Sequence, residues 1–280
     1  MTFETDPVVP QSGQMTVLTS RLTHRSNDKP VSDLQVLHER VIHNFIVKLD
    51  FSSFAHIHHE DFDRLNDGDL ERAELRFPYL FPTDGSYRIV SEFTHRDRSW
   101  TKHFDLQIGS ALTTPALNID LAREKTFGLY RTKLTVSPAV PVAGFETALV
   151  LELARGSQPV TDLELFLGSE VHVALWRIDG KHFGHTHTYT HHMAAMMAAI
   201  YDRATEPTAR AELMTKMMDT PAELIFRGPK IPVHYVFSEP GTYAIFFQSA
   251  PGGEPQIFDF MLEVSQYREG MDTRIDSMSQ

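Results

Sequence analysis

The sequence predicts an all-β protein made of two tandem immunoglobulin-like antiparallel β-sandwich repeats. Two observations carry this prediction. Short apolar or alternating segments are separated by turns containing Gly, Pro and Asp in both halves of the chain, a pattern typical of β-sandwiches. A set of residues in the first half also recurs in the second half at one constant spacing, which indicates an internal duplication.

The duplication can be followed without a gap from Pro30 to His58. The segment PVSDL at residues 30–34 recurs as PVTDL at residues 159–163. The same spacing carries His43 onto His172, Asp50 onto Asp179, Phe54 onto Phe183, His56 onto His185 and His58 onto His187. Three histidines, an aspartate and a phenylalanine in register twice are unlikely to arise by chance, so we interpret the two halves as copies of one domain.

The first repeat is expected to span residues 15–108. Residues 1–14, with Pro7, Pro10 and Gly13 and little to bury, are expected to be disordered. Strands are predicted at residues 15–22, 41–49, 54–59, 73–81, 87–93 and 100–108. The polar residues 23–40 and the acidic residues 60–72 are expected to form loops between them.

Residues 109–126 are expected to be a linker, residues 127–264 the second repeat and residues 265–280 a polar C-terminal tail. Residues 127–136 are predicted to be an added strand that opens the second repeat, and residues 258–264 the strand that closes it. The second repeat differs from the first by a Met- and His-rich insertion at residues 189–231. Its segments HHMAAMMAAIY and PTARAELMTKMM are rich in strong helix formers, which predicts a short helical insertion.

Composition excludes several functional classes. The chain of 280 residues has no cysteine, so disulfides, zinc fingers, blue-copper thiolates and thiol nucleophiles are excluded. A net charge of −11 argues against nucleic acid as a partner. No apolar run approaches the roughly 18 residues of a membrane helix, so no membrane span is expected in this chain. The two unusual counts are 15 histidines and 11 methionines.

The second copy of the repeat predicts a hairpin that brings three histidines together. In VHVALWRIDGKHFGHTHTYTHH, residues 171–192, Asp179 and Gly180 form a typical two-residue hairpin turn. This turn places His172 opposite His187, and the two-residue period of a strand puts His185 on the same face. That face also carries Ala174, Trp176 and Phe183, so the site is expected at the rim of an apolar core.

The first copy predicts an equivalent site made of His43, His56 and His58, with a less defined and longer turn at residues 50–53. His59 is expected to point the other way. His191 and His192 begin the insertion and are further candidate ligands of the second site. The other histidines are interpreted as ordinary polar residues: His24, His38, His95, His103, His182 and His234. His38 is the first exception to consider, because it is close in sequence to the first hairpin.

Three converging imidazoles suit a copper or zinc ion and leave a fourth coordination position over. Thioethers select Cu(I), so methionines beside histidines favour copper, with zinc as the alternative. Because the insertion grows from the second site, that site is expected to hold its ion more tightly. No Walker loop, dinucleotide fingerprint, nucleophile elbow or HExxH motif is present.

The pattern of PVxDL, a histidine, a strand, FxHxH and PxxGxY resembles a set of bacterial extracytoplasmic proteins with tandem β-sandwich repeats, often encoded near copper or heavy-metal handling genes. Members typically read DLxxYLGAxGH in the second copy and HxHP at the site. Here DLELFLG at residues 162–168 and His172 follow the first pattern. HTHT at residues 185–188 and HIHH at residues 56–59 keep both histidines but lack the proline.

The resemblance implies metal handling in a periplasmic or other extracytoplasmic space. Together with the histidines, it predicts a copper-binding protein of the cell envelope that acts in metal storage, delivery or resistance. A metal-donor or metal-acceptor protein could then dock through the Met-rich insertion. Two alternatives stay open, a His₃ metalloenzyme with an open coordination position and a structural or adhesion module whose histidines are incidental. Whether the protein is an enzyme is therefore left undecided.

Overall fold

The computed structural model describes residues 1–36, 40–110, 117–188 and 227–276, and it divides into two compact units, Met1–Asn118 and Ile119–Gln280. The described secondary structure is almost entirely β, which confirms the predicted fold class. The boundary between the units falls inside the predicted linker at residues 109–126. The predicted helical insertion, and with it most of residues 189–231, lies outside the described residues.

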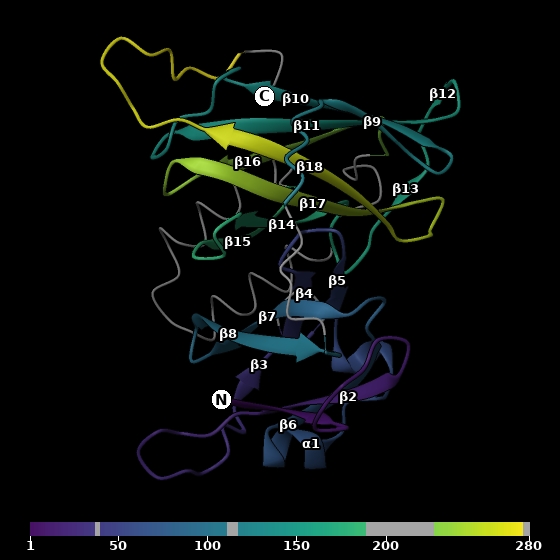
Figure 1. The fold of residues 1–280 in the computed structure, drawn as a ribbon, viewed down its shortest axis with the longest axis vertical. Helices are drawn as coiled ribbons and strands as arrows, with labels where there is room; N and C mark the ends of the chain where they lie inside the picture. The colour runs from purple at the N-terminus through teal and green to yellow at the C-terminus, as the bar shows by residue number, and fades with distance from the viewer. Residues whose placement is uncertain (37–39, 111–116, 189–226, 277–280) are drawn as a thin grey trace. The chain divides into compact units, whose positions relative to one another are not determined.

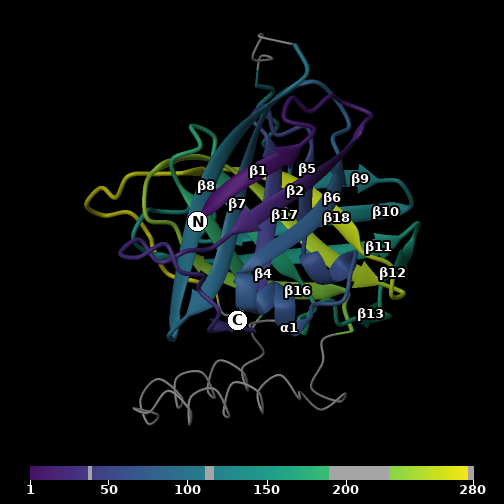
Figure 2. The same ribbon diagram turned by 90° about the horizontal axis from the view of Figure 1, so that it is seen from below.

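The first unit is a sandwich of two antiparallel sheets (Figures 1 and 2). One sheet has the order β1 (Thr2–Asp6), β2 (Met15–Arg21), β6 (Glu74–Leu80), and it faces the viewer in Figure 2. The other has the order β8 (Arg98–Ile108), β7 (Gly85–His95), β4 (Ile42–Lys48), β5 (Phe54–Ile57), with β3 (Leu34–Gln35) beside the end of β7. Leu18 and Phe77 from the first sheet and Ile46 and Ile89 from the second share one buried cluster, which is the core between the sheets.

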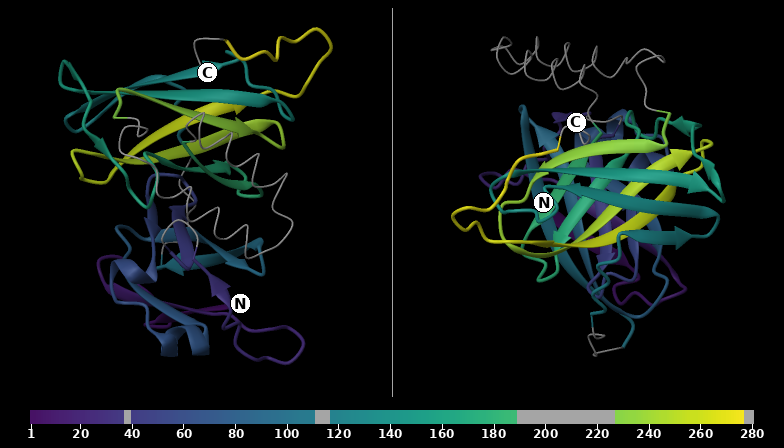
Figure 3. Two further views of the ribbon diagram at one scale, coloured as in Figure 1. Left: turned by 180° about the vertical axis from the view of Figure 1, so that it is seen from behind. Right: turned by 90° about the horizontal axis from the view of Figure 1, so that it is seen from above.

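The second unit repeats this arrangement and adds one edge strand (Figures 1 and 3). Its first sheet contains β9 (Glu124–Phe127), β10 (Tyr130–Ser137), β11 (Glu146–Arg155) and β16 (Lys230–Val236), with β12 (Gln158–Pro159) beside the end of β11. Its second sheet contains β18 (Gln256–Val264), β17 (Gly241–Pro251), β14 (His172–Arg177) and β15 (Phe183–His187), with β13 (Leu163–Glu164) beside the end of β17. The added edge strand is β9, and β10 takes the place that β1 has in the first unit.

Each unit has a tyrosine near the start of the strand that follows a short connection from one sheet to the other, β7 in the first unit and β17 in the second. The Tyr87 hydroxyl donates to the carbonyl of Thr83 at 2.9 Å, and the Tyr243 hydroxyl donates to the carbonyl of Glu239 at 2.9 Å. Both rings are fully or almost fully buried. A buried tyrosine bonded to backbone a few residues upstream is a recurring corner of immunoglobulin-like sandwiches. The two units therefore share details of the fold as well as strand order.

Three element predictions were wrong. Residues 1–14 are not wholly disordered, because Thr2–Asp6 pairs with β2 and the Phe3 ring stacks on Phe104 with centroids 5.0 Å apart. The acidic residues 60–72 are not only loop, because α1 (Asp67–Arg72) forms behind a capping box made by Asn66 and Asp69. Residues 127–136 are two strands rather than one, since Gly128, with φ +56, begins a two-residue hairpin turn between β9 and β10.

A candidate metal centre in each unit

The predicted strand register at both sites is correct. In the second unit His172 pairs directly with His187, and His185 pairs with Ala174. In the first unit His56 pairs with Phe45, which is the corresponding position of the repeat. The triads are thus brought together by equivalent pairs of strands, β14 with β15 and β4 with β5. Side chains of alternate residues then project from one face of each hairpin.

The two-residue turn predicted for the second hairpin was wrong, although the register was right. Arg177 N–H donates to the His182 carbonyl and Gly180 N–H to the Arg177 carbonyl, so residues 178–181 form a four-residue loop. Of Asp179 and Gly180, only Gly180 has positive φ, at +70°. The first hairpin has the same loop: Lys48 N–H donates to the Ser53 carbonyl, and Phe51, with φ +60, stands where Gly180 does. The loop at residues 178–181 has the same centre as the expected turn at Asp179 and Gly180, which preserves every cross-strand pair of the second hairpin. The loop at residues 49–52 is as long as the turn expected at residues 50–53 and begins one residue earlier.

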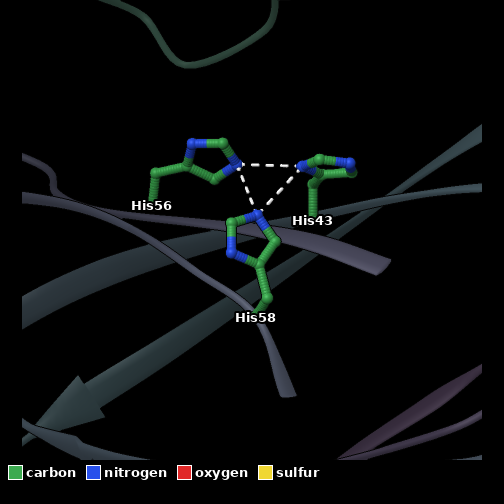
Figure 4. A group of neighbouring side chains, drawn as sticks. All are labelled: His43, His56 and His58. Atoms are coloured by element: carbon green, nitrogen blue, oxygen red, sulfur yellow. Dashed lines mark hydrogen bonds between the residues drawn. The ribbon is translucent and has the colours of Figure 1, made fainter. Parts of the chain in front are cut away.

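The three histidines of the first unit converge on one point (Figure 4). The Nδ1 atom of His43 lies 3.1 Å from Nε2 of His56 and 3.0 Å from Nε2 of His58, and the last two atoms are 3.0 Å apart. All three side chains are buried, with His58 fully shielded from solvent. Nitrogens at these distances can share hydrogen bonds or, with their lone pairs directed at one another, a common cation.

Asp61 fixes the orientation of His58. The Nδ1 atom of His58 lies 2.9 Å from the Asp61 carboxylate, which also accepts the His58 backbone N–H at 2.8 Å. Burial raises the pKa of Asp61, but the hydrogen bonds from His58 and electrostatic attraction, including that of Arg40, outweigh it, so this pKa lies below its usual range. A charged carboxylate on Nδ1 favours the tautomer whose Nε2 lone pair faces the other two rings, the arrangement that orients histidine ligands in metal sites.

Phe45 adds an apolar wall to the first triad. Its ring lies on that of His56 with centroids 4.2 Å apart and an interplanar angle of 15°. The stack limits rotation of the His56 ring, so both His56 and His58 are held by a neighbouring side chain.

The second triad is built from His172, His185 and His187, which stand at the same places in the repeat. The Nδ1 atom of His172 lies 3.5 Å from Nε2 of His185, and the ring of His187 lies 4.4 Å from each of theirs, centroid to centroid. The Nε2 atom of His172 donates to the Phe166 carbonyl at 2.8 Å. That bond places the proton on Nε2 and leaves the Nδ1 lone pair directed at the site.

Each triad lies on the sheet face opposite the sandwich core, and not at the rim of that core as the sequence predicted. In β14 the core residues are Val173 and Leu175, whereas His172, Ala174 and Trp176 alternate with them on the other face. In β4 the core uses Ile46, so His43 and Phe45 lie on its opposite face. Both faces of β4 and β14 are buried, and a strand apolar on both faces does not tell which face is the core.

The remaining candidates have different outcomes. His191 and His192, like the methionines of the insertion, lie outside the described residues. His59 takes no part in the triad: its Nδ1 atom lies 2.7 Å from the Arg76 carbonyl, as expected from its opposite direction. Sequence reasoning missed Asp61, whose only local signal is a carboxylate three residues after a candidate ligand. It also missed the Phe166 carbonyl, because every residue has a backbone carbonyl and the sequence does not indicate which one a side chain will contact.

The geometry of the first triad fits a transition-metal ion. With metal–nitrogen distances of about 2.0–2.1 Å, nitrogens 3.0–3.1 Å apart subtend roughly 95° at the ion. Three such ligands occupy one side of the coordination sphere and leave the other side for further ligands. The wider pair in the second triad, at 3.5 Å, corresponds to roughly 115°, nearer the tetrahedral value. Both triads could therefore hold a metal ion through imidazole nitrogens alone.

Within the described ranges, none of the helices has the length and apolar character that crossing a bilayer requires. Comparison with curated proteins finds no match.

Solved structures resemble the chain only weakly. They include latent PorU from Porphyromonas gingivalis, at 9% identity and a TM-score of 0.25 over 92% of this chain and 19% of that one, so the chain spans about a fifth of PorU. The fibronectin(III)-like modules of Clostridium thermocellum CbhA match at 10% identity and a TM-score of 0.23, over 98% of this chain and 100% of that one. The D0-D1 domain of intimin matches at 6% identity and a TM-score of 0.21, over 94% and 98%. Scores this low carry no argument about function.

The family comparison covers most of the chain. It matches residues 1–110 and 125–266, two ranges that correspond to the two sandwich units and contain all six histidines of the triads. On this evidence the chain belongs to the family described as "Domain of unknown function (DUF8832)".

Proposed function

We propose that this protein binds one transition-metal ion in each histidine triad and acts in metal storage, delivery or resistance. The observation that carries the proposal is the convergence of three buried imidazole nitrogens at 3.0–3.1 Å in the first unit. Its repetition by His172, His185 and His187 supports a role of the duplicated hairpin that goes beyond folding. A folding role alone would be served better by apolar side chains, which need no partners.

Copper is the metal we propose first, and zinc is the alternative. Imidazole ligands suit both ions, and a given nitrogen site binds Cu²⁺ more tightly than Zn²⁺. The resemblance described above to proteins encoded near copper-handling genes points the same way, as do the 11 methionines of the chain. An extracytoplasmic location belongs to the same proposal and rests on that resemblance. Fractionation of cells that express the native gene tests the location directly.

A catalytic role is the second candidate, favoured by the coordination positions that three nitrogen ligands of the first triad would leave unfilled. Three nitrogens that subtend roughly 95° leave positions where water, oxygen or a substrate could bind. Turnover by the copper- or zinc-loaded protein with peroxide, oxygen or ester substrates, lost in triad variants, would favour this candidate over carriage of the ion.

The deciding experiment is metal analysis of protein purified without a histidine tag, followed by titration with Cu(I), Cu(II) and Zn(II). We expect two triad-bound ions, one of them lost in His56→Ala/His58→Ala and the other in His185→Ala/His187→Ala. The matched control is His103→Ala/His234→Ala, which removes two histidines outside the triads, one from each unit. Equal stoichiometry in the wild type and both triad variants would contradict the proposal and leave a structural or adhesion module as the better interpretation.

A further inference from the structure

A third group of metal-ligand side chains lies in the first unit, away from the triads. It consists of His24, in the loop after β2, Asp33, just before β3, and His95, the last residue of β7. One ligand atom from each lies within 4.8 Å of the other two. The sequence treated both histidines as ordinary polar residues, because 71 positions separate them and only the pairing of β3 with β7 brings Asp33 to His95.

Asp33 and His95 form a hydrogen-bonded pair whose two ligand atoms are close enough to bind one ion together. The Nε2 atom of His95 lies 2.9 Å from the Oδ1 atom of Asp33, and the ring of His24 lies 5.7 Å from that of His95. His24 is held at its backbone, since its N–H donates to the Lys29 carbonyl and its carbonyl accepts from Asp28 N–H. Its side chain is half-buried, and one of its ring nitrogens lies within 4.8 Å of ligand atoms of the other two residues.

The Asp33 carboxylate can serve as a ligand without losing its other partner. Its Oδ2 atom faces the Nε atom of Arg96 at 3.3 Å, while Oδ1 faces His95. The Arg96 side chain is 74% exposed, so this ion pair is weak and screened by solvent. Monodentate coordination through Oδ1 would leave Arg96 on the second oxygen, an outer partner of the kind that ligating carboxylates usually have.

In the second unit, the positions equivalent to His24 and His95 are occupied by residues other than histidine. The bridge between Thr23 and Pro30 corresponds to the pairing of Ala154 with Pro159, so Arg155 stands where His24 does. Leu34 pairs with His95 as Leu163 pairs with Pro251, so Pro251 stands where His95 does. The carboxylate is kept as Asp162.

In the second unit that carboxylate is neutralised by the chain itself. Arg155 Nη1 lies 3.1 Å from Asp162 Oδ2, so the guanidinium supplies the positive charge. In the first unit the two imidazoles of His24 and His95 replace the arginine and the proline. The position thus keeps its carboxylate, has the longer and more exposed Arg96 contact in place of the Arg155 contact, and gains two ring nitrogens as neighbours.

From this comparison we propose that His24, Asp33 and His95 form a third metal site, which takes a divalent cation of the zinc type and is present only in the first unit. Two imidazoles and a carboxylate with an open fourth position are a ligand set that zinc uses in proteins. The site shares no residue with either triad. A negative result for the triads would therefore not contradict this third site, and a negative result here would not contradict the proposed function.

The test counts Zn²⁺ ions bound by the full chain, by competition with a chromophoric chelator. The variants are His95→Gln and Asp33→Asn, and the matched control is Asp162→Asn, which removes the corresponding carboxylate of the second unit. Co²⁺ is used as a second probe, since its visible absorption reports nitrogen and oxygen ligands around the ion. Circular dichroism confirms that each variant folds.

We expect His95→Gln and Asp33→Asn each to bind one Zn²⁺ fewer than the wild type, with the affinity of that site reduced at least tenfold, and to lose one component of the Co²⁺ spectrum. Asp162→Asn should match the wild type. If the triads bind no metal, the wild type should still bind one ion and His95→Gln none. Unchanged Zn²⁺ stoichiometry in both His95→Gln and Asp33→Asn would overturn the proposed site whatever the triads do.

Discussion

Phe45 and His56 lie face to face across the β4–β5 pair, with ring centroids 4.2 Å apart, whereas at the corresponding position of the second unit Ala174, which has no ring, stands opposite His185. The two triads thus have the same three ligand residues but differ in the neighbouring groups that hold those residues in place. The first is held by an aromatic stack and by Asp61, and the second by the Phe166 carbonyl. The expectation that the second site binds more tightly depends on the insertion, which lies outside the described residues, and it stays a prediction.

Replacing Phe45 by leucine should weaken metal binding at the first triad only. The smaller side chain cannot hold the His56 ring flat, so we expect the affinity to fall about tenfold, as for other residues that orient a ligand. Because Phe45 is buried, the variant should also lose about 1 kcal/mol of stability. Isothermal titration with Cu(II) measures the first effect, and Phe104→Leu is the control for loss of an aromatic ring elsewhere in this unit.

Replacing Asp61 by asparagine should also weaken metal binding at the first triad, because Asp61 orients the ligand His58. The pKa of the Asp61 carboxyl lies below its usual range, so its charge is present throughout the pH range in which histidine titrates. Loss of that charge removes the preference for the tautomer with Nε2 directed at the site. We expect a 10- to 100-fold lower affinity at the first triad and no change at the second.

The control for Asp61→Asn is Asp63→Asn, an exposed carboxylate two residues further along the chain. Equal loss in the two variants would mean that the general negative charge of this segment matters, and not its contact with His58.

Metal affinity at both triads should fall as the pH drops through about 6.5, the ordinary pKa of histidine. Neutral imidazole is the ligand, so protons compete with the ion, and three histidines per site allow more than one proton to be displaced. The apparent affinity should therefore change more steeply than tenfold per pH unit between about 6 and 5. Competition titrations at several pH values measure the slope, and a slope of zero would indicate carboxylate rather than imidazole ligands.

The Arg177–Asp179 pair in the second hairpin loop should stabilise that unit in a pH-dependent way. The hydrogen bond from Arg177 lowers the pKa of Asp179 to about 2, against desolvation that raises it. A depressed folded-state pKa gives stabilisation that is present above about pH 4 and is lost as the pH falls through about 2. Asp179→Asn keeps an acceptor for the Lys181 N–H but loses the charge.

We expect Asp179→Asn to be less stable than the wild type by under about 1 kcal/mol at pH 6, with the difference vanishing near pH 2. Urea unfolding followed by the fluorescence of the buried Trp176 measures it, and Glu263→Gln controls for the loss of one negative charge. A difference that persists at pH 2 would assign the effect to packing or to the turn instead.

The sequence by itself determined the duplication, the all-β class and the pairing of His172 with His187. Each follows from local information, namely a repeated motif, a two-residue side-chain period and the centre of a turn. The turn itself was mispredicted, yet the pairing survived because a four-residue loop at residues 178–181 has the same centre as Asp179 and Gly180. A register depends on where a turn is centred more than on its type.

Only the tertiary structure decided which face of β4 and β14 forms the sandwich core, because both faces of these strands are buried and apolar residues occupy both. It also decided that Asp61 holds His58, that Thr2–Asp6 forms a strand, and that His24, Asp33 and His95 meet. These features depend on partners distant in sequence or on side-chain direction after a strand ends. Their free energy comes from contacts that exist only once whole sheets have paired, so a local pattern of residues carries no record of them.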